Sequence, residues 1–179
     1  MTSTSAALAR AVGRGVVLPA LLLWAVACGE VGGGRWLTAR WIGSEPGRLS
    51  APATASWCPV AGRLDVRAVR GDLGIGLVLY PVGDIATGSY PAFDPGIDSV
   101  HRPGAGAAIR WFTEHEVVGF QSDSGSVELT RTDDVLLLRF GFRLRSLNGK
   151  DTVVAQGRVA SLPLGPCPAD SVPNAAPTQ

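Results

Sequence analysis

The sequence predicts an all-β domain, an antiparallel β-sandwich or, as the alternative, a small β-barrel. From Arg35 onward no stretch keeps a helical period, whereas several segments alternate apolar and polar residues as half-buried strands do. The 179 residues include 23 glycines and 13 prolines without a fixed period, which is typical of loop-rich β-proteins rather than collagen. The length suits a single domain, expected over residues 35–168.

The clearest strand is predicted over residues 135–145. Every second residue there is a large apolar one, so one face of the strand is hydrophobic: Leu136, Leu138, Phe140, Phe142 and Leu144. Asn148-Gly149 follow, and this pair favours a hairpin because both residues tolerate positive φ. Residues 152–159 are the predicted return strand. Upstream, residues 126–130 alternate and turn at residues 132–134, so the three strands form a meander.

A second predicted strand pair spans residues 64–68 and 75–80, with a turn at residues 71–74. Pro81 ends the second of these strands because proline cannot donate to a ladder. Residues 87–106 are rich in proline and glycine and are expected to form a long surface loop. Unequal strands and this loop favour a sandwich over a regular up-and-down barrel. Weaker strand candidates are residues 35–42, 109–112 and 117–120.

Residues 1–27 have the pattern of a secretory signal peptide. Arg10 and Arg14 precede an apolar run over residues 16–26, which is short of the roughly 20 residues that cross a bilayer. Ala25-Val26-Ala27 is a small-x-small cleavage site. The sequence therefore predicts an exported chain that begins at Cys28, with a Pro- and Ala-rich tail over residues 169–179 that is expected to be disordered.

The cleavage site followed by Cys28 also resembles the bacterial lipobox, in which the cysteine thiol is acylated. This resemblance implies a lipid anchor at Cys28 and a flexible tether over residues 28–34, which contain three consecutive glycines. Gly29, rather than Asp, follows the cysteine, which implies the outer membrane if the cell has one. The alternative is a soluble secreted or periplasmic protein.

Three cysteines leave one unpaired, and their number bears on the anchor. If Cys28 carries palmitate and the other acyl groups, Cys58 and Cys167 remain as an even pair for a disulfide in an oxidising compartment. The alternative is one free thiol among the three. A Cys58–Cys167 bridge would close a loop of about 110 residues and would stabilise the fold by roughly 4–5 kcal/mol in the chain-entropy model.

The chain as a whole resembles a family of bacterial envelope lipoproteins of unknown function with a single β-sandwich domain. The segments that carry this resemblance are Ala39-Arg40-Trp41-Ile42-Gly43, Gly88-Ser89-Tyr90, residues 124–130, the strand through Phe140 and Phe142, and Asp151-Thr152-Val153. One departure is Leu138-Arg139, where related chains carry a small residue before the Phe-x-Phe pair. The resemblance implies location and fold, and no reaction.

The candidate chemical sites are few. His115 lies between Glu114 and Glu116, as a general acid or a metal ligand could, but the zinc-binding spacing is absent and an exposed loop histidine is the expected reading. Residues 94–98 and 123–125 carry aspartates that could ligate Ca²⁺, although turn chemistry explains them without a metal. We therefore expect no metal and no cofactor.

Arg139, Arg143 and Arg145 lie on the outward face of the predicted strand, with Arg158 beside them, and are the candidate anion-binding residues. A solvated sheet face is the alternative. The tryptophans at positions 36, 41, 57 and 111 could stack on sugars if exposed, but are expected in the core.

The sequence favours a non-enzymatic envelope lipoprotein that acts as a binding or structural module. A carbohydrate- or anion-binding module and a small hydrolase built on His115 are the alternatives. A formal charge of +1 gives no electrostatic case for nucleic acid, so the expected partner is the membrane, through the lipid, with any protein or glycan partner open.

Overall fold

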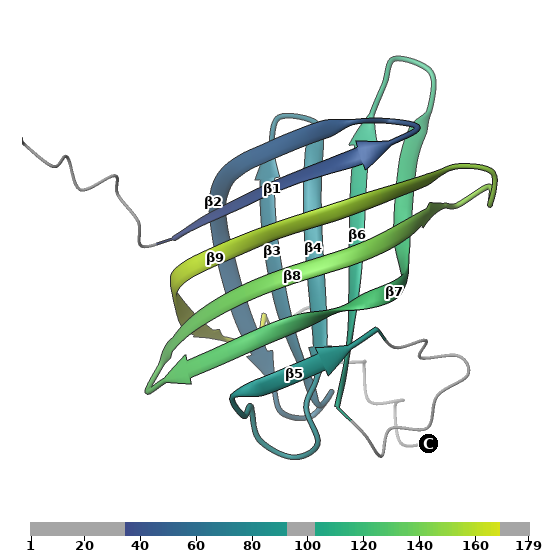
Figure 1. Ribbon diagram of the computed structural model, residues 1–179. Helices are drawn as coiled ribbons and strands as arrows, with labels where there is room; N and C mark the ends of the chain where they lie inside the picture. Colours follow the sequence, from purple (N-terminus) through teal and green to yellow (C-terminus); the bar gives the residue numbers. More distant parts are fainter. Residues whose placement is uncertain (1–34, 93–102, 169–179) are drawn as a thin grey trace, which may run out of the picture. The chain divides into compact units, whose positions relative to one another are not determined.

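The described part of the chain is built from β-strands, as predicted. The computed structural model describes residues 35–92 and 103–168, which belong to one compact unit and contain no helix (Figure 1). The predicted signal peptide, tether and C-terminal tail lie outside the described residues. Within those ranges there are nine strands: β1 (Trp36–Gly43), β2 (Gly47–Cys58), β3 (Arg63–Arg70), β4 (Leu73–Tyr80), β5 (Gly88–Pro91), β6 (Gly104–Phe112), β7 (Val117–Thr132), β8 (Val135–Ser146) and β9 (Thr152–Pro166).

The sheet closes on itself because its first and last strands are neighbours. Each of β1, β2, β3, β4, β6, β7, β8 and β9 pairs antiparallel with the next, and β1 also pairs with β9, so that Leu37 lies between Ala51 and Val159. Figure 1 shows β1, β9 and β8 side by side in one wall. The domain is therefore an eight-stranded antiparallel barrel: the predicted sandwich is wrong, and the alternative of a small barrel is correct.

The unequal strand lengths that favoured a sandwich have another cause. β7 has 16 residues and β9 has 15, and each contains a bulge and changes partner along its length. The bulge in β9 lies next to Ser161, which has a φ of 51°, and past it the strand pairs in parallel with β2. Long strands that bend at a bulge let one sheet close into a barrel.

Apolar side chains from all eight barrel strands fill the interior. On β2, Leu49 is followed by three small inward residues, Ala51, Ala53 and Ala55, which leave room for larger neighbours. Each large buried side chain contributes about 1.5–3 kcal/mol to folding. The largest fully buried side chains are Phe142, Leu37, Leu64, Leu79, Leu129, Leu136, Leu138, Leu144 and Leu162.

The predicted turns are confirmed. Gly149 in the β8–β9 turn has a φ of 75°, and Gly71 in the β3–β4 turn has a φ of 58°. Asp133 takes a φ of 52° in the two-residue connection between β7 and β8. β4 ends at Tyr80, immediately before Pro81. Local turn chemistry was therefore sufficient to place these hairpins.

β6 and β7 separate part-way along the barrel wall, and β5 pairs with the part of β7 that β6 leaves unpaired. The two strands pair only from Ala108 opposite Gln121 to their shared turn. Beyond that point the Ser122 Oγ atom accepts a hydrogen bond from the Ala107 N–H at 2.9 Å, and β5 pairs with the second half of β7. The predicted loop over residues 87–106 is thus partly wrong: it contains β5 and the start of β6, while residues 93–102 lie outside the described residues.

Tyr90 of β5 packs into the hydrophobic core, and its hydroxyl bonds to the connection that precedes β5. Its side chain is buried, and its hydroxyl donates to the Ala86 carbonyl at 2.7 Å and accepts from the Ala86 N–H at 3.3 Å. Burial raises the pKa of the Tyr90 phenol above its ordinary value, and the hydrogen bond from Ala86 opposes this shift. The neutral phenol is therefore the form that the fold favours.

Candidate anion-binding groove

Four arginines form two directly facing pairs on the outer wall of the barrel. Arg40 of β1 lies opposite Arg48 of β2, and Arg139 of β8 lies opposite Arg158 of β9. All four point outward because their neighbours in each strand, such as Ala39 and Phe140, point into the core. The antiparallel register of four adjacent strands thus gathers four guanidinium groups on one surface.

The two pairs lie next to each other because β1 and β9 are also neighbours. Arg40 stands opposite Gln156, and Arg158 stands opposite Thr38, so the second pair is displaced by two residues along the strands. Together they border an open groove of about 750 Å³. The groove is lined by Thr38, Ala39, Arg40, Arg48, Leu49, Ser50, Arg139, Phe140, Gln156, Gly157 and Arg158.

The charges of this groove are not balanced by carboxylates. Among the described residues, no carboxylate oxygen lies within 4.0 Å of the four guanidinium groups. Glu128 of β7 stands opposite Arg139 in register but forms no ion pair with it. Like charges directly opposite each other in a sheet are destabilising. The fold therefore bears an electrostatic cost here that a bound anion would relieve.

Gln156 is the one described side chain that holds an arginine of the groove in place. With its amide oxygen facing the guanidinium, Gln156 accepts hydrogen bonds from the Arg40 Nε atom at 2.7 Å and the Nη2 atom at 2.6 Å. This contact leaves the guanidinium charge uncompensated because the amide is neutral. It therefore orients Arg40 without neutralising it.

Gly157 allows the strands of this wall to approach closely. A Cβ atom at this position would overlap the Phe140 ring and the Thr38 carbonyl oxygen. Only glycine therefore fits between β8 and β1 at this point, as is usual where another part of the chain comes close to a strand.

The other two predicted arginines have a partner. The bulge in β7 inserts Asp123 between residues that pair with Leu144 and Arg143. Its Oδ2 atom lies 3.4 Å from the Arg143 Nε atom and 3.6 Å from the Arg145 Nη2 atom. Arg143 and Arg145 thus share one carboxylate, while Arg139, on the same face of β8, belongs to the unpaired group.

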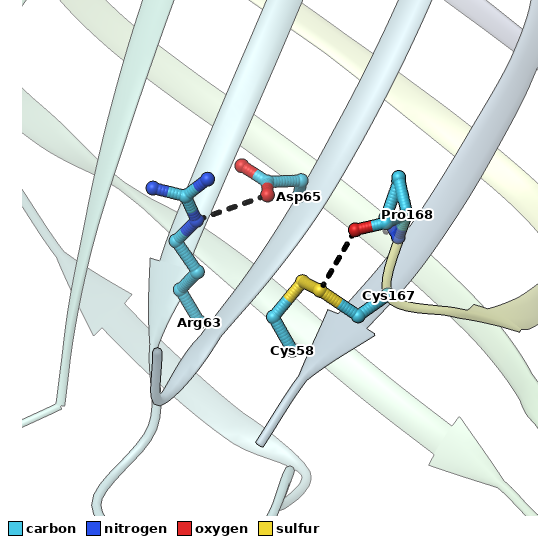
Figure 2. Close-up of polar contacts among 5 residues, drawn as sticks. All are labelled: Cys58, Arg63, Asp65, Cys167 and Pro168. Atoms are coloured by element: carbon cyan, nitrogen blue, oxygen red, sulfur yellow. Dashed lines mark hydrogen bonds and ion pairs between the residues drawn. A yellow bond between two sulfur atoms is a disulfide. The ribbon is translucent and has the colours of Figure 1, made fainter. Parts of the chain in front are cut away.

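The predicted disulfide between Cys58 and Cys167 is confirmed, with a Cα–Cα distance of 4.6 Å (Figure 2). It lies next to the short parallel ladder in which Trp57 of β2 pairs with Pro166 of β9. Figure 2 also shows Arg63 on the adjoining strand, whose Nε atom donates to the Asp65 carboxylate at 3.1 Å. The bridge joins the last residue of β2 to the residue after β9.

His115 lies in the exposed turn between β6 and β7. The Thr113 Oγ1 atom accepts from the N–H groups of His115 at 3.3 Å and Glu116 at 3.0 Å, which explains the local sequence as turn chemistry. No carboxylate of the described residues lies within 4.0 Å of the His115 ring. His101 lies outside the described residues. The geometry gives no support to a hydrolytic site at this position.

The remaining candidates are placed as follows. The described residues contain no group of three or more His, Cys, Asp or Glu side chains that could hold a metal ion. Asp123 forms the contact with the two arginines described above, and residues 94–98 lie outside the described ranges. Trp41 is buried, as expected, and Trp111 is half-buried and stacked on Phe120 at 5.7 Å, whereas Trp36 is 46% exposed.

Comparison with known proteins adds no relative: no protein-family model, no curated protein and no solved structure matches the chain. Across the part of the chain that the structure describes, there is no helix able to span a bilayer. The sequence pattern identified Arg139 and Arg158 but missed Arg40, Arg48 and Gln156. No local signal could have found these three, because their place in the groove depends on the closure of the barrel.

Proposed function

We propose that this chain is an exported, lipid-anchored envelope protein whose barrel binds anionic groups in the arginine groove. The observation that carries the binding role is the set of four guanidinium groups without a carboxylate partner. Arginine presents a planar fork of donors that suits phosphate and carboxylate oxygens, and charge-assisted hydrogen bonds of this kind are worth about 1.5–3 kcal/mol each. A sheet face that is only solvated has no need to bring four arginines together without a carboxylate partner.

Export and anchoring are supported by the N-terminal pattern and by the disulfide. Residues 16–28 combine an apolar run with a lipobox-like cleavage site, and the Cys58–Cys167 bridge is typical of proteins that fold in an oxidising compartment. With those two cysteines paired, Cys28 is left as the acylated residue. Acylation with more than one chain gives stable membrane attachment, and Gly29 favours the outer membrane where the cell has one.

The anion-binding role is tested by isothermal titration of the protein with pyrophosphate at low salt. We expect binding that weakens as salt is added, because the exposed charges become screened. The R40Q/R158Q variant, which removes one guanidinium from each pair, should bind at least tenfold more weakly. The matched control is R67Q/R110Q, which removes two exposed arginines from β3 and β6, outside the groove. Equal losses in both variants would contradict a defined site.

The anchor is tested by incorporation of labelled palmitate into the chain in a bacterial host. We expect label in the wild type and none in the Cys28→Ala variant, with the protein then released from the membrane fraction. Cys58→Ser serves as the control for loss of a cysteine as such, and its labelling should persist. Unchanged labelling in the Cys28→Ala variant would refute the anchor.

A further inference from the structure

The four arginines are spread too widely to meet one small anion together. Adjacent strands lie about 4.8 Å apart and residues advance about 3.4 Å along a strand. The centres of the two pairs are separated by two strand spacings and two residues, and therefore by about 12 Å at the level of the backbone. Arg48 and Arg139, the outermost members, are three strand spacings and two residues apart, about 16 Å. Arg40 and Arg158, the innermost members, are one strand spacing and two residues apart, about 8 Å. A single phosphate, with hydrogen bonds of about 3 Å, can therefore meet two neighbouring arginines but not all four.

The surface between the pairs is polar and uncharged. Thr38 and Gln156 occupy the two outward positions that separate Arg40 from Arg158, and Ser50 flanks them on β2. These side chains can hydrogen-bond to the middle of a ligand without demanding charge there. Gly157 and Ala39, which also line the groove, add no bulk that would interrupt a chain lying across the strands. The groove is thus continuous from one arginine pair to the other.

We propose that the groove binds a linear polyanion that crosses β2, β1, β9 and β8 and engages both arginine pairs at once. The anionic groups of such a chain must extend over at least about 12 Å, the distance between the centres of the two pairs. This inference rests on the proposed anion-binding function and specifies its ligand class. Binding at the first pair places the rest of the chain beside the second, which converts the second contact into an intramolecular one. Affinity should therefore depend steeply on the length of the ligand.

The test is a titration of the full chain with orthophosphate, pyrophosphate and linear oligophosphates of increasing length. We expect the short ligands to bind weakly and the affinity to rise at least tenfold, about 1.4 kcal/mol, once the chain spans both pairs. In the variants R40Q/R48Q and R139Q/R158Q, each of which keeps one complete pair, the longest oligophosphate should bind no more tightly than pyrophosphate does. The R67Q/R110Q control should keep the length dependence of the wild type.

The outcomes separate the two proposals. If pyrophosphate binds as tightly as the longest chain, or if either pair variant keeps the length dependence, bridging is overturned while anion binding stands. If no phosphate compound binds at any length, the proposed function itself fails. All six substituted arginines have exposed side chains, so the variants should unfold at temperatures close to that of the wild type, and a thermal melt monitored by circular dichroism verifies this.

Discussion

Arg139 and Arg143 lie on the same outward face of β8, yet their surroundings differ. Arg143 and its neighbour Arg145 contact Asp123, a carboxylate that the β7 bulge places between them. Arg139 instead lies beside Arg158 and near the Arg40–Arg48 pair, with no described carboxylate in ion-pair range. The same residue type on the same strand face thus forms an ion pair at one end, whereas at the other Arg139 forms none with the described residues, although Glu128 stands opposite it in register.

This difference shows that a sheet can place a carboxylate beside neighbouring arginines and so reduce the repulsion between them. One inserted residue in β7 is sufficient to supply a carboxylate to Arg143 and Arg145. In the groove, the outward positions that could carry an acid, Thr38, Ser50 and Gln156, are all occupied by neutral residues. Uncompensated charge costs stability, and a bound anion would relieve that cost, which is the reason for placing the proposed anion site in the groove.

The largest effect should come from giving the groove the carboxylate that it lacks. In the Thr38→Glu variant, an acid would stand directly opposite Arg158 on the exposed face of the wall. We expect oligophosphate affinity to fall about tenfold and the free energy of unfolding to rise by about 0.2–1 kcal/mol, the range for opposite charges paired across strands. Calorimetric titration and urea denaturation measure the two quantities. A gain in stability without a loss of oligophosphate affinity would show that the oligophosphate does not bind at these arginines.

The matched control is Thr38→Gln, which changes the size of the side chain without adding charge. It should leave both the affinity and the unfolding midpoint close to those of the wild type. If Thr38→Gln weakens binding as much as Thr38→Glu, the effect is steric and the electrostatic account is wrong at this position.

The reverse change should have a smaller effect. Asp123→Asn removes the acid from Arg143 and Arg145, whose side chains are 53% and 54% exposed. Because exposed ion pairs are screened by solvent, we expect a loss of about 0.2–1 kcal/mol in unfolding free energy. Oligophosphate affinity should rise two- to threefold, roughly 0.4–0.7 kcal/mol, as the positive surface extends along β8. A decrease in affinity would show that Asp123 supports the groove instead of limiting it.

The smallest effect is expected at Gln156. The Gln156→Ala change removes the amide that orients Arg40 but no charge. Affinity should fall about twofold, about 0.4 kcal/mol, because Arg40 then loses conformational freedom when the ligand binds. Gln156→Glu provides the contrast, since a carboxylate there would pair with Arg40 and weaken binding further. If Gln156→Ala and Gln156→Glu behave alike, Gln156 does not act through Arg40.

Much of the fold could be predicted from the sequence because its signals are local. The alternation in β8, the Asn148-Gly149 turn and the parity of the cysteines each depend on a few residues, and the structure confirms the strand, the turn and the Cys58–Cys167 pair. The closure of the barrel was missed because it depends on the pairing of β1 with β9, more than a hundred residues away, and on bulges that no residue type marks reliably.

The candidate site was predictable only in part for the same reason. Arg139 and Arg158 lie on strands joined by a hairpin, so the turn fixes their register. β2 was not predicted at all, since most of its inward residues are alanines and its hydrophobic pattern is weak. The place of Arg40 and Arg48 in the site therefore depends on the register of β1 with both β2 and β9, which the sequence pattern does not reveal.

The central claim is tested most directly by nuclear magnetic resonance of the arginine Nε–H groups during titration with a linear oligophosphate that is long enough to span both pairs. The account predicts that the signals of Arg40, Arg48, Arg139 and Arg158 shift together and saturate at one equivalent, while those of Arg143 and Arg145 change little. Shifts centred on Arg143 and Arg145, or no site-specific shift at any arginine, would contradict it.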